Sequence, residues 1–212
     1  MHETAAGARG RLAMTRYQMH GMSGSIMLVD SGRVVLHEGY GLADRERRIP
    51  ASTSTIYDVG SITKTFTAAA ILRLVGDGKI DLRAPIARYF ADVPADKANI
   101  TVDDILTHTA GFALDPSNAG INAEDSYDIF VAKALKAPLI HNPRSAYSYS
   151  NLGYGLLAII VERVSGENFR SFVTRTLITP SQLANTRWWS DSAAMTGGDA
   201  ARGYEFSDRE SV

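Results

Sequence analysis

The pattern of apolar residues changes once along this chain, from short extended runs to helical spacing. Ser25–Val29 and Val34–Leu36 are apolar runs separated by the turn residues Asp30-Ser31-Gly32, which predicts a β-hairpin. From residue 61 to about residue 185, apolar residues instead recur at helical spacing, and extended segments return only near residue 186. Because strands and helices are segregated rather than alternating, the sequence predicts an α+β fold.

Composition limits the classes of protein to which this chain can belong. Its 212 residues are 45% hydrophobic and 21% charged, as in a globular protein of one domain or two small ones. A net charge of −1 gives no electrostatic attraction for nucleic acid or for an anionic membrane surface. The chain has no cysteine and only five scattered histidines, so we expect no metal site and no cofactor.

The apolar runs and the N-terminal residues bear on localisation. No apolar run reaches the ~20 residues that a membrane-spanning helix requires. Residues 1–21 contain basic side chains but no apolar core, so no signal peptide is visible. The localisation stays open, with the cytoplasm as the default and the periplasm or secretion as the alternative if the true N-terminus is missing.

The most informative stretch runs from Val59 to Leu72 and takes the chain from an extended approach into a helix. Ser61 is expected at the start of that helix, where unpaired backbone N–H groups and the positive end of the helix dipole point outward. Lys64 follows three residues later on the same helical face, so its amine can reach the Ser61 hydroxyl. A serine needs a base to become a nucleophile, and a desolvated lysine can be that base.

This Ser-x-x-Lys spacing also has an ordinary structural explanation. Serine is a preferred N-cap residue, and a lysine in the first turn of a helix is common at protein surfaces. However, the spacing occurs once in the chain, and a cation at the positive end of a helix is unfavourable unless it has a partner. The pattern therefore leaves both catalysis and simple capping open.

A second candidate site is the polar segment Tyr149-Ser150-Asn151. The tyrosine hydroxyl could share a proton with Ser61 and Lys64, and the Asn151 amide could hold a carbonyl or amide group of a substrate. Tyrosine, serine and asparagine are also ordinary loop residues, and Asn151 could simply cap the helix that follows.

Further helices are predicted after the central one. Thr101 and Asp104 stand three residues apart before an apolar run, which indicates a capping box. Pro85 lies in the first turn of another predicted helix, where the missing N–H is not needed. The predicted ranges are 85–90, 101–106, 124–135, 153–164 and 167–177.

Taken together, three stretches resemble the β-lactamase-related serine hydrolases, which include class C β-lactamases, D-alanyl-D-alanine carboxypeptidases and β-lactamase-like esterases. The stretches are VGSITKTFTAAAILRLVGDGKIDLRAPIARYF, ITVDDILTHTAGF and YSYSNLGYGLLAIIVERVSG. The resemblance extends from about Gly24 to Phe206. It implies a β-lactamase/transpeptidase-like fold, in which an antiparallel sheet flanked by helices accompanies a mainly helical region.

The resemblance also implies roles for individual residues. Ser61 would be the acylated nucleophile, Lys64 its proton-accepting partner, Tyr149 a general base and acid, and Asn151 a substrate-positioning amide. Tyr149-Ser150-Asn151 takes the place of the family's second motif. The stretch that contains His108 is similar to a turn beneath the family's site, so we interpret His108 as structural rather than catalytic.

One part of the family pattern is missing. The family has a third motif, Lys-Thr-Gly or His-x-Gly, on a strand well after the Tyr-x-Asn loop, and the chain has no Lys-Thr-Gly. His37-Glu38-Gly39 matches the alternative, but it precedes Ser61 and is discounted. We therefore expect a C-terminally incomplete β-lactamase-like domain without the later sheet strands. It should be weakly active or inactive when isolated, and prone to self-association through its hairpin.

The expected organisation is a single domain over residues 1–212. Its parts are a lead-in with a short helix at 11–19 (1–23), the hairpin and the approach to the nucleophile (24–60), a helical body (61–185) and the start of a return to the sheet (186–212).

Two functions from different classes follow. The first is a serine hydrolase that forms an acyl-enzyme at Ser61 and cleaves carboxylic esters or β-lactam and D-peptide amides, with esters slightly favoured. The second is an inactive fragment or pseudoenzyme that only binds a ligand or a partner chain. A conventional Ser-His-Asp hydrolase has little support, because the sequence has no Gly-x-Ser-x-Gly elbow.

Overall fold

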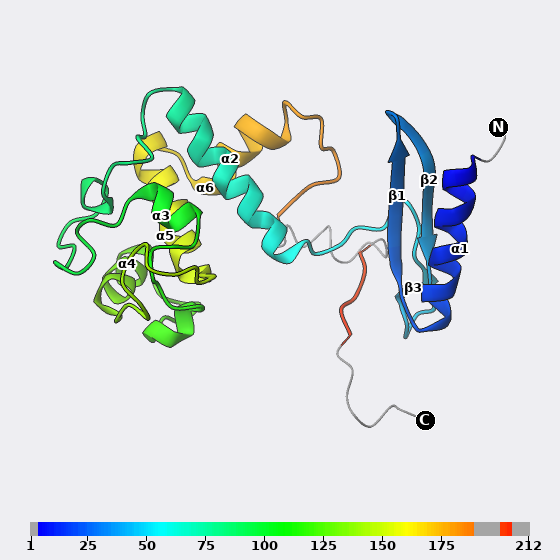
Figure 1. Cartoon of the computed structure of the whole chain (residues 1–212), viewed down its shortest axis with the longest axis horizontal. Coiled ribbons are helices and arrows are strands. Elements are labelled where there is room, and N and C mark those ends of the chain that lie inside the picture. Colours follow the sequence, from blue (N-terminus) through cyan, green and yellow to red (C-terminus); the bar gives the residue numbers. More distant parts are fainter. Residues whose placement is uncertain (1–3, 189–199, 205–212) are drawn as a thin grey trace. The chain divides into compact units, whose positions relative to one another are not determined.

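The computed structural model describes residues 4–188 and 200–204, and its α-helices and longer strands are labelled in Figure 1. The chain forms two compact units. Unit 1 combines Met1–Val59 with Asn185–Val212, and unit 2 is the continuous segment Gly60–Ala184. All the described strands belong to unit 1 and all but one of the described α-helices to unit 2, which confirms the predicted segregation of an α+β fold.

Unit 1 contains one helix and two small antiparallel sheets. Its elements are α1 (Ala5–Met19), β1 (Gly24–Asp30), β2 (Arg33–Tyr40), β3 (Leu42–Asp44) and β4 (Ile49–Pro50). Strands β1 and β2 form the predicted hairpin, in which Gly24 lies opposite Tyr40 and Asp30 opposite Arg33. The turn residues Ser31 and Gly32 both have positive φ, as the right-handed twist of a tight hairpin requires.

Helix α1 packs against the hairpin and is longer than the predicted 11–19. It begins at Ala5 because Thr4 caps it, accepting a hydrogen bond from the Gly7 N–H at 3.0 Å. Gly10 allows close approach to the hairpin, since a Cβ there would lie 2.4 Å from Leu28 Cδ1. This glycine-rich start lacks the apolar periodicity that predicts helices from sequence.

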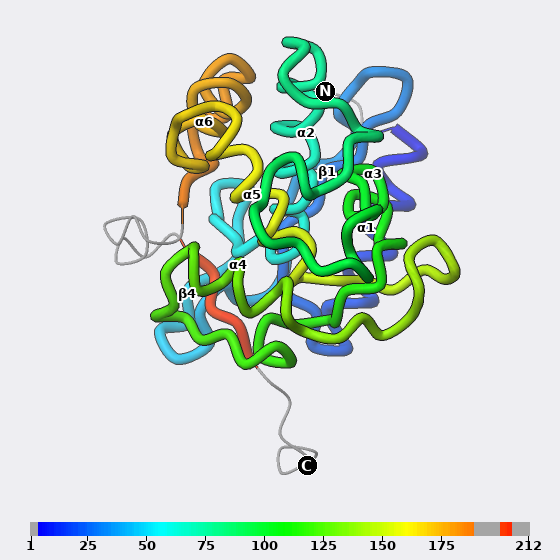
Figure 2. Tube along the Cα trace, turned by 90° about the vertical axis from the view of Figure 1, so that its left-hand side faces the viewer, coloured from blue at the N-terminus to red at the C-terminus, as the bar shows by residue number. Residues whose placement is uncertain are grey.

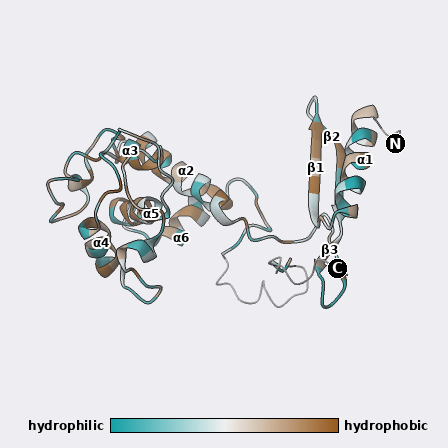
Figure 3. Ribbon diagram, turned by 60° about the horizontal axis from the view of Figure 1, so that its bottom comes forward, coloured by the Kyte–Doolittle hydropathy of each residue, from teal (hydrophilic) through white to brown (hydrophobic). Residues whose placement is uncertain are grey.

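Residues 26–29 of strand β1 are apolar, and much of the strand is brown in Figure 3. Met27, Val29 and the facing Val34 of β2 are each more than half exposed. Self-association through this hairpin stays a prediction.

Residues 200–204 belong to unit 1 and contact its β3–β4 region. Arg202 pairs with the buried Asp44 at 3.1 Å and with Glu46 at 2.9 Å. The Arg45 N–H donates to the Tyr204 hydroxyl at 2.7 Å. Ala200 forms an isolated parallel β-bridge with Ile56. The predicted return to the sheet over residues 186–212 stays a prediction, and most of it falls outside the described ranges.

Unit 2 is helical in its described residues, and Figure 2 follows its chain path. Its elements are η1 (Gly60–Ile62), α2 (Thr63–Gly76), η2 (Ile86–Arg88), α3 (Val102–Leu106), η3 (Pro116–Ala119), α4 (Tyr127–Lys136), α5 (Asn151–Ser165), α6 (Phe169–Val173) and the π-helical turn η4 (Thr174–Ile178). The single helix predicted at 167–177 is thus divided into α6 and η4. None of the described helices has the length and apolarity to span a membrane.

Helix α5 is the centre of unit 2 and contacts α2, α3, α4 and α6. Its inward residues have almost no exposed surface, which accounts for its strongly apolar sequence. Helix α2 contributes Ile71 and Leu74 to this core, and α3 contributes Ile105. The core therefore fixes the start of α2 and the start of α5 within the same unit, and these two helix starts carry the candidate residues.

Candidate active site

Ser61 lies in the 3₁₀ turn η1, directly before α2. Its side chain is not used as a helix cap, because the N-cap residue of α2 is Ile62 and no side chain caps this helix. The capping explanation for Ser61 is therefore wrong. The residue is exposed at the positive end of a 14-residue helix, where a nucleophile is accessible and developing negative charge is stabilised.

Lys64 lies in the first turn of α2, and its amine has several partners. Nζ is 3.3 Å from Ser61 Oγ and donates to Asn151 Oδ1 at 2.6 Å. It also lies 4.6 Å from the centre of the Tyr149 ring and 5.6 Å from that of Tyr154. Electrostatic attraction to the faces of these rings helps to hold the amine beside the serine.

Tyr149 lies on the loop before α5, and its side chain contacts Ser61. Its hydroxyl is 2.6 Å from Ser61 Oγ. The Lys64 amine, and then the Ser61 hydroxyl, lower the pKa of Tyr149 below its ordinary value. A nearby positive charge and a hydrogen-bond donor both favour the phenolate, which is the form that can accept a proton from Ser61.

Asn151 is the first residue of α5 and joins Lys64 to a residue that the sequence interpretation missed. The N-cap of α5 is Ser150, whose Oγ accepts from the Gly153 N–H at 2.9 Å, so the capping explanation for Asn151 is wrong. Asn151 Nδ2 instead donates to Asp115 Oδ1 at 2.6 Å. A carboxylate at this place accepts hydrogen bonds, so Asp115 keeps Asn151 Nδ2 toward itself and Oδ1 toward Lys64.

Asp115 lies at the N-cap of η3, where its backbone N–H donates to Asn118 Oδ1 at 3.1 Å and its backbone oxygen accepts from the Asn118 N–H at 3.0 Å. The signal available in the sequence was the Asp-Pro-Ser-Asn run, which is typical of a capped turn. That run fixes the local turn but does not indicate a partner 36 residues away.

The segment from His108 to Leu114, here called the frame, holds Tyr149 and Asn151 in place through hydrogen bonds. Backbone hydrogen bonds join Ser148 N to His108 O at 2.8 Å and Asn151 N to Leu114 O at 2.7 Å. The Ser150 hydroxyl also donates to Ala113 O at 2.6 Å. Tyr149 is therefore held from both sides along the main chain.

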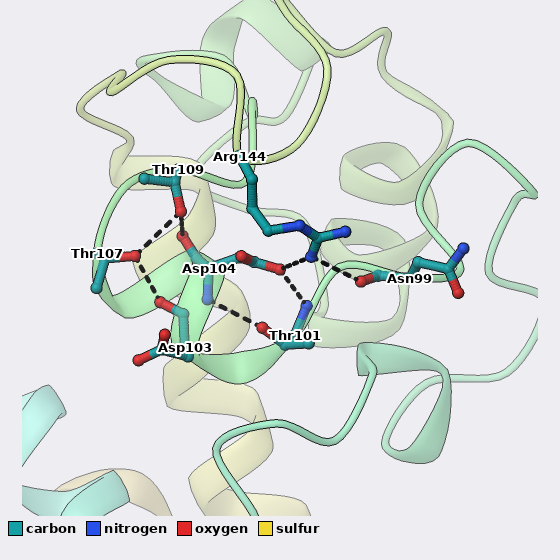
Figure 4. A network of polar contacts seen from close by, with 7 residues as sticks. All are labelled: Asn99, Thr101, Asp103, Asp104, Thr107, Thr109 and Arg144. Atoms are coloured by element: carbon teal, nitrogen blue, oxygen red, sulfur yellow. Dashed lines mark hydrogen bonds and ion pairs between the residues drawn. The ribbon is translucent and has the colours of Figure 1, made fainter.

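A polar network at α3 supports this frame (Figure 4). The predicted capping box is present, with the Asp104 N–H donating to Thr101 Oγ1 and the Thr101 N–H donating to Asp104 Oδ2. Arg144 Nη1 donates to the same carboxylate at 2.6 Å, and the Arg144 backbone N–H donates to Thr109 O at 2.7 Å. Arg144 therefore ties the loop before Tyr149 to the start of α3.

The structure thus places all four predicted site residues together: Ser61, Lys64, Tyr149 and Asn151. His108 packs against the Tyr149 ring, and its interpretation as a structural residue stays a prediction. Within residues 4–188 and 200–204, no group of three or more histidine or acidic side chains could hold a metal ion.

This fold and site define a class of protein. The family described as Beta-lactamase matches residues 9–211, so the chain belongs to that family, whose members are usually serine hydrolases. Its α+β, β-lactamase/transpeptidase-like fold is likewise confirmed.

The chain is similar to particular members of this family. It is 30% identical over 171 residues to Protein flp of Staphylococcus aureus, covering 76% of this chain and 34% of that protein. It is 26% identical over 179 residues to penicillin-binding protein 4* of Bacillus subtilis, covering 80% of this chain and 39% of that protein. The octameric penicillin-binding protein homologue from Pyrococcus abyssi matches with a TM-score of 0.80 and 26% identity, over 97% of this chain and 49% of that one. The chain therefore spans between a third and a half of the length of these relatives.

Proposed function

We propose that this protein is a serine hydrolase that forms an acyl-enzyme at Ser61. The observation that carries the proposal is the convergence of two proton-handling groups on one hydroxyl, with the Tyr149 oxygen at 2.6 Å and the Lys64 nitrogen at 3.3 Å from Ser61 Oγ. An exposed serine at a helix start needs neither the Tyr149 hydroxyl nor the Lys64 amine for helix capping or packing, whereas a nucleophilic serine needs a proton acceptor.

The first half of the reaction forms the acyl-enzyme. Ser61 Oγ attacks the substrate carbonyl carbon and gives its proton to the Tyr149–Lys64 pair. The carbonyl oxygen takes the negative charge, which the Ser61 backbone N–H and the positive end of α2 stabilise. The bond to the leaving group then breaks, and the proton passes from the Tyr149–Lys64 pair to the departing alcohol or amine.

The second half releases the acyl group. Water attacks the ester carbon of acylated Ser61, and the Tyr149–Lys64 pair accepts a proton from it. The bond from the acyl carbon to Ser61 Oγ breaks, and that oxygen takes the proton back, which leaves a free carboxylic acid.

Asn151 serves as the substrate-positioning amide in this proposal. Its Oδ1 accepts from Lys64 and its Nδ2 donates to Asp115, so one N–H and one lone pair stay available for a substrate. Both remaining groups belong to an amide that is held rigidly on two sides. Such an amide can orient a substrate carbonyl or N–H without first being ordered itself.

The substrates in this proposal are carboxylic esters or β-lactam and D-peptide amides, with esters slightly favoured. The same groups serve each of these reactions, because each begins with attack on a carbonyl carbon. Parallel assays with a short-chain nitrophenyl ester, a chromogenic cephalosporin and a D-amino-acid amide distinguish them.

The proposal is tested with a fluorophosphonate probe and intact-mass detection. We expect one covalent adduct on the wild-type chain and none on Ser61→Ala. Ser117→Ala, at an exposed serine of the same unit, is the matched control and should keep the adduct. A folded wild-type chain that forms no adduct would support the alternative, a pseudoenzyme that binds a ligand or partner.

A further inference from the structure

His108 accepts a hydrogen bond from the main chain beside the catalytic tyrosine. The Ser150 backbone N–H points at His108 Nδ1 across 3.1 Å. An imidazole nitrogen accepts a hydrogen bond only when it carries no proton, so this contact requires the neutral ring with its proton on Nε2.

This contact fixes the placement of Tyr149. His108 accepts from Ser150 N through its ring and from Ser148 N through its carbonyl oxygen, which are the residues on either side of Tyr149. The imidazole also packs against the Tyr149 ring, with centroids 4.5 Å apart. His108 thus holds Tyr149 through both neighbouring residues and through a contact with its ring.

The surroundings of the ring do not favour its protonated form. The titratable and charged groups recorded against His108 in the described structure are Lys64 from α2, Tyr154 from α5, and Tyr147 and Tyr149 from the preceding loop. None of them is a carboxylate. Burial, and then the Lys64 charge, lower the pKa of His108 below its ordinary value.

We propose that His108 is a positioning residue whose neutral imidazole holds Tyr149 against Ser61, so that protonation of His108 switches the site off at acidic pH. This inference rests on the proposed function. A protonated Nδ1 would place one N–H donor against another, and the Ser150 peptide would lose its partner. The loop that carries Tyr149, and with it the start of α5 at Asn151, would then shift away from Ser61.

The sign of the pH effect follows from the lowered pKa. His108 is neutral, and its contact is intact, at pH values above the folded-state pKa. Activity is lost as the pH falls through that pKa, which lies below about 6.5, the ordinary value for histidine.

Two substitutions separate the hydrogen bond from the titration. His108→Asn places an amide oxygen the same number of bonds from the main chain as Nδ1, and that oxygen does not titrate. Asparagine also tolerates the positive φ of 59° at this position better than most residues. His108→Leu fills similar space but offers no acceptor.

The experiment measures the rate of probe acylation from pH 4.5 to pH 8 for the wild type and both variants. Below the His108 pKa we expect the wild-type rate to fall about tenfold more per pH unit than protonation of the Tyr149 oxygen alone would cause. His108→Asn should be several-fold slower than the wild type at neutral pH but should lack this additional fall. His108→Leu should be slow throughout, and thermal unfolding checks that it is folded. If the additional, steeper fall persisted unchanged in His108→Asn, the inference would be overturned.

Nuclear magnetic resonance tests the same contact independently of catalysis. We expect the Nε2–H tautomer for His108 at neutral pH, and a Ser150 amide signal that shifts on acidification in the wild type but not in His108→Asn. An Nδ1–H tautomer, or a Ser150 signal that does not respond to acidification, would contradict the inference. Normal resonances in a chain that never reacts with the probe would instead count against the proposed function.

Discussion

The site has two arms that are held in different ways: the α2 arm, which carries Ser61 and Lys64, and the Tyr149 arm, which carries Tyr149 and Asn151. Ser61 and Lys64 lie one turn apart at the start of α2, and helical geometry alone brings them together. Tyr149 and Asn151 lie on a loop and at a helix start that are fixed by hydrogen bonds to His108, Ala113, Leu114 and Asp115. The first arm is thus local and the second depends on contacts that are distant in sequence.

This difference predicts which substitutions should affect the reacting groups directly and which should affect them indirectly. A substitution on the α2 arm changes a reacting group itself but few of the contacts that hold the reacting groups in place. A change on the Tyr149 arm can act from a distance, by moving groups that are themselves unaltered. The following predictions probe this contrast, beginning with the largest effect.

Lys64→Arg should reduce acylation on the order of 10⁴-fold, because an arginine stays protonated and cannot take part in proton transfer. Single-turnover labelling with the probe measures the loss. Lys79→Arg, at an exposed lysine after the same helix, is the matched control and should react normally. If Lys64→Arg were acylated at the wild-type rate, Lys64 would not take part in proton transfer.

Tyr149→Phe should reduce acylation about 10²–10³-fold, because only the proton-accepting hydroxyl is lost. Thermal unfolding should change little, since the ring contacts remain. In the wild type the rate should rise with pH through the Tyr149 pKa, at a pH below the ordinary tyrosine value of about 10. Tyr147→Phe, on the exposed neighbour, is the control. Full activity in Tyr149→Phe would make that residue structural.

Asp115→Ala should reduce kcat about 10- to 100-fold, the amount expected for loss of one hydrogen bond to a charged group. Asn151 would no longer be forced to direct Oδ1 toward Lys64. Asp115→Asn keeps an acceptor for Asn151 Nδ2 and should retain most of the activity. Equal losses in the two variants would mean that the Asp115 charge, and not the orientation of the Asn151 amide, is what matters.

Asp104→Ala should destabilise the protein by about 2 kcal/mol, because the Thr101 N–H and Arg144 lose a shared partner. Its effect on acylation should be only a few-fold, exerted through the loop before Tyr149. Asp103→Ala, exposed on the same turn, is the control for thermal unfolding. If Asp104→Ala lowered acylation as strongly as Tyr149→Phe, the support of the loop before Tyr149 would matter as much as the reacting hydroxyl, and the contrast would fail.

Much of the α2 arm could be predicted from the sequence, because a fixed helical spacing determines which side chains meet. The hairpin and the capping box at Thr101 were predictable for the same reason, since each is a pattern within a few residues. The assignment of residues 1–212 to a single domain stays a prediction.

The supports of the Tyr149 arm could not be predicted in this way. His108 meets Ser150 across 42 positions and Asp115 meets Asn151 across 36. These contacts join irregular segments, which have no periodicity that would reveal a shared face. Asn151 was a candidate from the polar Tyr149-Ser150-Asn151 segment, and the family resemblance implied its role, whereas its partner Asp115 became visible only in three dimensions.

The pairing of residues 200–204 with the β3–β4 region has a consequence for synthesis on the ribosome. Glu46 emerges 156 residues before its partner Arg202, a delay of roughly 8–30 s at the usual rates of translation. Throughout that interval the Asp44 carboxylate has no Arg202 to neutralise it. Unit 2 is continuous in sequence and emerges entirely within this interval. It can therefore fold before residues 200–204 reach the β3–β4 region of unit 1. A nascent chain from which residues 1–184 have emerged would therefore present a folded helical unit and a complete β1–β2 hairpin, while the β3–β4 region still lacks the segment that pairs with it. The apolar residues 26–29 of β1 would then be the surface that a ribosome-associated chaperone encounters.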